Sequence, residues 1–200
     1  EQLIDFWASV EKKTGVIINY DERVDGISSA PGGVGHIVQT GRGSYHARTV
    51  LLAIGRRGTP RKLDVPGEEL SKVTYRLIDP AQHNGQDVLV VGGGDSALEA
   101  ATSIAAEGQA RVTLSYRSAA FSRAKPKNRS RVESMMTSGP LTVLFNSTVS
   151  RIGSDQVELD INGKKQQLAN DAVIVSAGGI LPTGFLRDIG VSVETKHGTE

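Results

Sequence analysis

Residues 88–101 read Val-Leu-Val-Val-Gly-Gly-Gly-Asp-Ser-Ala-Leu-Glu-Ala-Ala, an apolar run that passes through three glycines into an alanine-rich stretch. The run Val88–Val91 is typical of a strand covered on both faces, as in a parallel sheet. Gly92 suits a tight turn, Gly94 allows a close backbone approach, and Ala97 lets a helix pack against its strand. The pattern therefore predicts a strand, a glycine loop and a helix, in that order.

The start of this helix is expected to bind a pyrophosphate, because its free N–H groups and the positive end of its dipole converge there. The predicted dinucleotide site comprises Gly92, Gly93, Gly94, Asp95, Ser96 and Ala97. Ser96 either caps a free N–H or donates to a phosphate oxygen, and the sequence leaves both roles open. The dipole favours Asp95, but a pyrophosphate would repel it, so we expect this side chain to face away. A purely structural turn is the alternative.

The composition is that of an ordinary globular protein, with 200 residues, 38% apolar and 22% charged. The net charge of +1 argues against a nucleic-acid binder that relies on an overall basic field. The absence of cysteine excludes disulfides and a thiol redox centre within this chain. We expect no metal site, because the four histidines lack ligand spacing and are expected at the surface: His36, His46, His83 and His197. No apolar run could span a bilayer and no signal peptide is apparent, so we expect a cytoplasmic location.

Two stretches of the chain share one plan. In the first, about residues 2–60, an amphipathic helix precedes a strand at Val16–Asn19 and a hairpin formed by His36–Thr40 and Tyr45–Thr49. The apolar run Val50–Gly55 is predicted to close this copy as a strand.

The second copy, about residues 128–182, repeats the order and follows directly on the glycine-loop unit. After its helix come predicted strands at Leu141–Phe145, Thr148–Ile152, Gln156–Ile161 and Lys164–Leu168, and a closing strand from Ala172. The first copy has no glycine-loop unit, so its equivalent is expected before Glu1. We therefore interpret the chain as a fragment of a protein with two dinucleotide sites. A chance likeness between two hairpins is the alternative.

Several stretches together resemble thioredoxin-reductase-like flavoproteins over nearly the whole chain. Residues 50–55 and 60–69 resemble the exit of the flavin domain, and Gly92–Ala101 resembles the NADPH fingerprint. Tyr116–Ser118, together with Phe121, Arg123 and Ala124, resembles an arginine motif of the family. Ser176–Thr183 resembles the return to the flavin domain. The resemblance implies that Glu99 lies near the nicotinamide half of the nucleotide. From the sequence alone, Glu99 is simply a polar position on an alanine-rich helix.

The chain departs from this family in two places. Thioredoxin reductases proper carry a Cys-x-x-Cys pair shortly before the glycine loop, whereas residues 73–86 contain no cysteine. This is closer to the cysteine-free relatives, the thioredoxin-reductase-type ferredoxin–NADP reductases and the bacillithiol-disulfide-reductase-like proteins. The family's second arginine is Ser118 here and its third falls at Ser122, with Arg123 one residue along.

The end of the predicted strand Arg111–Tyr116 is expected beside the adenosine ribose. An acid there would select NAD, and no acid lies within reach. Arg117 offers planar donors suited to a phosphate, Ser118 and Arg123 extend that clamp, and Tyr116 is placed to stack on adenine. These residues favour NADP(H), although the incomplete clamp keeps NAD(H) as an alternative. The other interpretation of both arginines is a solvated basic surface.

Ala177, Gly178 and Gly179 follow the closing strand, at the edge where ligands of open α/β sheets bind, and complete the predicted site. The expected fold class is α/β: a Rossmann-like parallel sheet with an inserted antiparallel β-meander, plus a partial second domain of the same plan. Its predicted parts are residues 1–70, the end of an FAD-binding domain; residues 71–182, a complete NAD(P)H-binding domain; and residues 183–200, the return into the FAD domain.

The resemblance implies an oxidoreductase that passes a hydride from NADPH to FAD, which the full-length protein would hold, and onward to an external acceptor. Hydride transfer needs no protein acid or base, so we name no catalytic residue. The expected partners are a nicotinamide nucleotide, a ferredoxin-like carrier or small disulfide as acceptor, and a second copy in a homodimer. Neither nucleic acid nor a membrane is expected. The alternatives are a non-catalytic NAD(P)H-sensing module and a methyltransferase, which the absent ribose-binding acid disfavours.

Overall fold

The computed structural model describes residues 2–55 and 59–194. These residues fall into two compact units, one within residues 1–55 and 182–200 and the other within residues 56–181. The predicted domain limits at residues 70 and 182 refer to the complete protein and stay a prediction; the described units divide at residues 55 and 181 instead. His197 lies outside the described residues. Among those described, no helix is long and apolar enough to cross a bilayer.

A five-stranded parallel sheet forms the centre of the larger unit, in the order β5-β12-β6-β7-β8. Its strands are β5 (Val73–Thr74), β6 (Asp87–Val91), β7 (Arg111–Tyr116), β8 (Leu141–Phe145) and β12 (Ala172–Val175). The strands predicted at 88–91, 111–116 and 141–145 are confirmed. The central strand, β6, lies between β12 and β7, so both of its edges are hydrogen-bonded.

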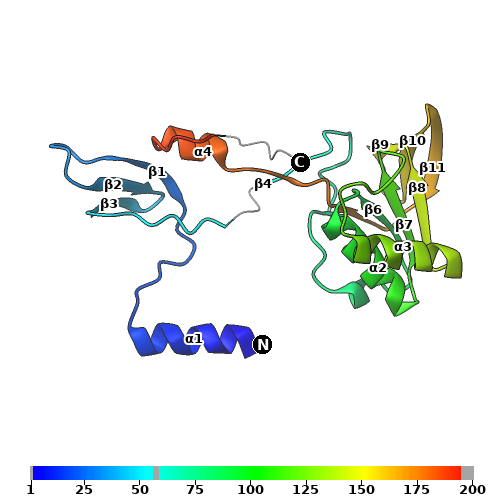
Figure 1. The fold of residues 1–200 in the computed structure, drawn as a ribbon, viewed down its shortest axis with the longest axis horizontal. Helices are drawn as coiled ribbons and strands as arrows, with labels where there is room; N and C mark the ends of the chain where they lie inside the picture. Colours follow the sequence, from blue (N-terminus) through cyan, green and yellow to red (C-terminus); the bar gives the residue numbers. More distant parts are fainter. Residues whose placement is uncertain (1, 56–58, 195–200) are drawn as a thin grey trace. The chain divides into compact units, whose positions relative to one another are not determined.

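Both faces of this sheet are covered, which explains the uninterrupted apolar run in β6. Helices α2 (Asp95–Glu107) and α3 (Pro126–Ser138) pack on one face (Figure 1), where Val88 and Val90 join their core. Leu89 and Val91 belong to a second core with Val157 and Leu159. Because successive side chains of a strand point to opposite faces, each of the four residues is buried. The expected α/β class with a Rossmann-like parallel sheet is confirmed.

The second core is covered by the antiparallel meander predicted from the sequence. It consists of β9 (Ser147–Ile152), β10 (Gln156–Ile161) and β11 (Lys164–Ala169), with β10 in the middle. The hairpin between β10 and β11 turns at Asn162-Gly163, where both residues have positive φ angles of 52° and 80°. That conformation is the one an Asn-Gly hairpin turn requires.

The smaller unit contains α1 (Gln2–Thr14), a three-stranded antiparallel sheet and the short helix α4 (Thr183–Asp188). Its strands are β1 (Val24–Ser29), β2 (His36–Thr40) and β3 (Gly43–Ala47). The predicted helix and hairpin are confirmed, although β3 begins earlier than expected, and β1 was not predicted. Each unit thus has a helix followed by a three-stranded antiparallel sheet, as the proposed internal repeat requires.

Two strands predicted for the first copy are wrong. Residues 16–19 and 50–55 form neither helix nor strand, and Ile17 and Leu51 are 89% and 92% exposed. The closing strand of the second copy, β12, pairs with β5 and β6 on its two sides. Within the described part of the smaller unit no parallel strand lies beside residues 50–55. An apolar run without a hydrogen-bonding neighbour does not become a strand.

His83 also departs from expectation, because it is buried rather than at the surface. It ends the short 3₁₀ helix η1 (Pro80–His83), which precedes β6. Its Nδ1 lies 2.9 Å from the Gln86 side-chain oxygen, so its polar ring is satisfied within this turn. His36 is half-buried and His46 is exposed.

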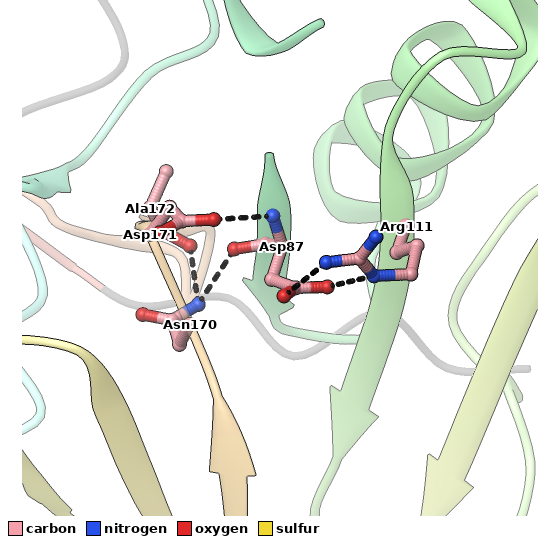
Figure 2. A network of polar contacts seen from close by, with 5 residues as sticks. All are labelled: Asp87, Arg111, Asn170, Asp171 and Ala172. Carbon is pink, nitrogen blue, oxygen red and sulfur yellow. Dashed lines mark hydrogen bonds and ion pairs between the residues drawn. The ribbon is translucent and has the colours of Figure 1, made fainter. Parts of the chain in front are cut away.

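A polar network holds the N-terminal edge of the parallel sheet (Figure 2). Asp87 at the start of β6 forms an ion pair with Arg111 at the start of β7, through contacts of 2.5 and 2.6 Å. Asp171 accepts a hydrogen bond from the Asp87 backbone N–H, and the Asn170 amide donates to the Asp87 and Ala172 carbonyls. This edge is closed by protein groups, whereas the opposite, carboxyl-terminal edge is open and carries the glycine loop.

Candidate dinucleotide-binding site

Gly92 directly follows β6 in a conformation that only glycine adopts easily, with φ of +145°. A β-carbon here would overlap the carbonyl oxygen of Ser176, which follows β12. The Ser176 N–H donates to the Val91 carbonyl at 2.7 Å, and the Gly92 N–H donates to the carbonyl of Ser115 in β7 at 3.0 Å. Gly92 therefore allows three neighbouring strand ends to converge.

The N-cap residue of α2 is Gly94, and no side chain caps the helix. Ser96 is thus not the cap, and that hypothesis for its hydroxyl is wrong. A β-carbon on Gly94 would meet nothing within 4 Å, so the loop faces open space at this point. Ala97, fully buried, packs the first turn of α2 close to Gly92, as expected. An uncapped helix start beside open space has the geometry that a pyrophosphate needs.

A groove with a volume of about 1370 Å³ lies along this edge of the sheet, wholly within the larger unit. Its size is ample for a dinucleotide, since small-molecule sites typically enclose roughly 300–1,000 Å³. Most of the predicted residues line it: Gly92, Gly93, Gly94, Asp95, Ser96, Glu99, Tyr116, Arg117, Arg123, Ala177, Gly178 and Gly179. Ala97 and Ser118 do not line it. Ala97 is buried beneath the loop, and the Ser118 carbonyl accepts a hydrogen bond from the Asn146 N–H.

An aromatic cluster supports the end of β7. The Tyr116 ring stacks on Phe121, with ring centroids 5.4 Å apart and planes 19° apart, and Phe121 packs on Phe145 at 5.0 Å. Tyr116 also lies directly over Gly93, where a β-carbon would overlap its ring. The Tyr116 ring therefore already has two protein contacts, one with Phe121 and one with Gly93. Its stacking on adenine stays a prediction.

Asp95 lines the groove, but its carboxylate is bonded to the start of α3. Its Oδ1 accepts hydrogen bonds from the Lys125 backbone N–H at 2.8 Å and from the Asn128 side chain at 2.7 Å. These two bonds, the Lys125 one first, hold the pKa of Asp95 below its usual value. The carboxylate therefore stays ionised, with its charge directed toward donors of the protein.

The structure adds basic residues to the groove that sequence analysis missed, namely Arg61, Lys62 and Arg76. The loop carrying the first two is held by Glu68, whose carboxylate accepts bonds from the N–H groups of Leu63 and Asp64 at 2.6 and 2.8 Å. Residues 59–60 and 179–180 pair as the short strands β4 and β13, and the Arg61 N–H donates to Gly178. No local sequence motif predicts that these basic residues line the groove, because the strand pairing that brings them there joins segments more than a hundred residues apart.

Tyr75 lies at the same side of the groove and donates to Glu68 at 2.8 Å. Burial and the adjacent Glu68 carboxylate raise the pKa of Tyr75 to about 12, so its hydroxyl stays protonated. In the described part of the chain, no group of three or more His, Asp or Glu residues could hold a metal ion. The groove therefore offers glycine backbone, a helix start and arginines, which suit an anionic nucleotide.

A family model described as pyridine nucleotide-disulphide oxidoreductase matches residues 1–199. Bacilliredoxin reductase Bdr of Bacillus subtilis is 29% identical over 165 residues, which is 81% of this chain and 50% of that protein. A ferredoxin–NADP reductase of Ignicoccus hospitalis is 32% identical over 159 residues, 76% of this chain and 50% of that protein.

Among solved structures, the bacillithiol disulfide reductase Bdr from Staphylococcus aureus superposes with a TM-score of 0.83 at 26% identity. The match covers 98% of this chain and 60% of that one. The chain spans about half the length of the curated relatives it matches.

Proposed function

The chain belongs to the pyridine nucleotide-disulphide oxidoreductase family, and from this membership we propose that it binds NADP(H) for a longer flavoprotein oxidoreductase. The observation that carries the proposal is the groove at the carboxyl-terminal edge of the sheet. There the open Gly94, the uncapped start of α2 and two arginines, Arg117 and Arg123, face one space. No acidic residue follows β7 within the stretch from Arg117 to Arg123.

In this proposal the glycine loop and the first turn of α2 hold the pyrophosphate. Arg117 and Arg123 bind the ribose 2′-phosphate, since guanidinium groups match phosphate geometry. Glu99 and the segment Ala177–Gly179 flank the nicotinamide half. The residues supply binding and orientation, and we assign none of them a proton-transfer role.

When bound, the nicotinamide supplies a hydride, and FAD in the full-length protein is its proposed acceptor. The final electron acceptor we propose is a ferredoxin-like carrier or a small disulfide. Support comes from the names of relatives, which include bacilliredoxin reductase and several ferredoxin–NADP reductases, and from the absence of cysteine in this chain.

Isothermal titration of the 200-residue chain with NADP⁺, NADPH and NAD⁺ tests the nucleotide site. We expect saturable binding of one nucleotide per chain, with NADP(H) tighter than NAD(H). Gly94→Val is the matched variant, because it places a side chain where the structure has only open space and should abolish binding while the fold is kept. A folded wild-type chain that binds none of these nucleotides would refute the proposal.

The proposed activity distinguishes this protein from an NAD(P)H-sensing module. The full-length protein, loaded with FAD, should oxidise NADPH when an electron acceptor is present. Binding of NADPH by that protein without flavin reduction would favour the sensing module.

A further inference from the structure

The segment between β7 and α3, residues 117–125, carries two of the groove-lining arginines, Arg117 and Arg123, and is anchored to the rest of the unit at two points. Near its middle, Phe121 is 7% exposed and packs between Tyr116 and Phe145. At its end, the Lys125 N–H donates to Asp95 in the first turn of α2. The position of the arginines therefore depends on how firmly α3 is bonded to α2.

Asn128 connects the two helices by hydrogen bonds, and this connection is called the α2–α3 join below. Its amide nitrogen donates to Asp95 Oδ1 at 2.7 Å and to Glu99 Oε1 at 2.9 Å. A side-chain amide has two N–H donors, and here they serve two carboxylates. Asp95 and Glu99 are four residues apart, so they lie on one face of α2 in successive turns and repel each other. A neutral double donor between them offsets that repulsion and joins both turns to the start of α3.

The charged residues that the Asn128 amide contacts, or that neighbour it in sequence, lie near the starts of α2 and α3. Asp95 and Glu99 belong to α2, and Lys125, Lys127 and Arg129 are the cations beside Asn128 in sequence. Among the described residues, the donors to the two carboxylates are the Lys125 backbone N–H and the Asn128 amide. The join is thus made by neutral donors at set distances rather than by a mobile cationic side chain.

We propose that Asn128 is a positioning residue for nucleotide specificity, because it sets the distance between the glycine loop of α2 and the arginine-bearing segment before α3. The inference rests on the proposed function, in which the first element binds the pyrophosphate and the second the 2′-phosphate. A nucleotide without the 2′-phosphate uses only the first element. Loosening the join therefore weakens NADP(H) binding and has little effect on NAD(H).

The test compares the affinities of the chain for NADP⁺ and NAD⁺ in Asn128→Asp and Asn128→Ala. Asn128→Asp replaces a double donor by a third carboxylate facing the other two. We expect the NADP⁺/NAD⁺ affinity ratio to fall about tenfold, the effect of one hydrogen bond to a charged group. Ser130→Asp is the control: it adds the same charge to an exposed position on the same helix and should keep the wild-type ratio.

A double variant that exchanges the two side chains tests whether the affinity ratio can be restored. In Asn128→Asp with Asp95→Asn, the donor and the acceptor exchange places, so one hydrogen bond between the helices is restored and the ratio should recover in part. If Asn128 has a purely structural role, its substitution should lower the unfolding temperature and weaken the binding of both nucleotides equally. If Asn128→Asp does not fold, the affinity ratio of Asn128→Ala provides the test.

The possible outcomes distinguish a failure of this inference from a failure of the proposed nucleotide-binding function. A wild-type preference that persists in folded Asn128 variants would overturn the inference alone. A wild type that binds both nucleotides equally would overturn the inference and the proposed 2′-phosphate contacts, and would leave the dinucleotide site standing. A wild type that binds neither nucleotide would overturn the proposed site and the inference with it.

Discussion

Gly93 and Tyr116 lie in direct contact, so that a β-carbon on Gly93 would fall within the Tyr116 ring. The middle glycine of the loop thus makes room for a protein side chain, whereas Gly94 beside it faces open space. The Tyr116 ring in turn stacks on Phe121, which restricts its movement away from Gly93. The glycine loop and the end of β7 are therefore packed tightly against each other.

Gly93→Ala should destabilise the fold by about 1–3 kcal/mol, the usual cost of overpacking a well-filled site. Urea denaturation followed by circular dichroism measures it. In a Tyr116→Ala background the same substitution should cost much less, because the ring it meets is gone. Gly94→Ala is the control for stability and should leave the midpoint nearly unchanged. Equal costs of Gly93→Ala in both backgrounds would contradict the contact.

Arg117→Ala should remove most of the preference for NADP(H) over NAD(H), a loss of about 1–3 kcal/mol in NADP(H) binding for a charge-assisted phosphate contact. Calorimetric titration of both nucleotides measures the difference. Arg131→Ala removes an exposed arginine of α3 that does not line the groove, and should keep the preference. An unchanged preference in Arg117→Ala would exclude Arg117 from phosphate recognition.

The ion pair between Asp87 and Arg111 should make stability depend on acid pH. The Arg111 hydrogen bonds hold the pKa of Asp87 below its usual 3.8 in the folded chain. The pair therefore stabilises the fold above that unfolded-state value, and the contribution is lost as pH falls through the lower folded-state pKa. Asp87→Asn should unfold at lower urea than wild type at pH 7, and the gap should close below about pH 3.8. A gap that is constant from pH 7 to pH 2.5 would refute this role.

The purified 200-residue chain should not hold FAD. No glycine loop following a strand is found between Glu1 and Pro31, so the first copy offers no site for a flavin pyrophosphate. We expect a colourless protein after purification with added FAD, with no diaphorase turnover. A stoichiometric flavin absorbance band in the purified chain would contradict this expectation.

The full-length protein should deliver electrons directly to an external partner, because this chain has no cysteine at the position of the thioredoxin-reductase dithiol. Steady-state oxidation of NADPH with each acceptor in turn measures this. Ferredoxin, flavodoxin or a low-molecular-weight disulfide should support turnover, and thioredoxin should not. Efficient reduction of thioredoxin by a full-length protein that lacks a dithiol elsewhere would exclude this acceptor assignment.

Local signals in the sequence were sufficient to predict the strand, glycine loop and helix of the larger unit. The run Val88–Val91, the three glycines and the alanine-rich helix each reflect a short-range requirement: burial on both faces, a positive φ or open space, and close packing of helix on strand. The Asn162-Gly163 turn likewise sets its own hairpin. These predictions needed no knowledge of distant residues, and the structure contains all of these elements.

Only the tertiary structure decided what depended on partners far away in the chain. Residues 50–55 have the composition of a buried strand, yet they remain irregular because no strand among residues 2–55 and 59–194 pairs with them. Arg61 and Arg76 joined the groove through the pairing of β4 with β13 and the place of β5 in the sheet. Asn128 reached two carboxylates about thirty residues away. Hydrogen bonds between distant segments form only when the whole chain folds, so a pattern along the sequence determines which groups are available but not which of them meet.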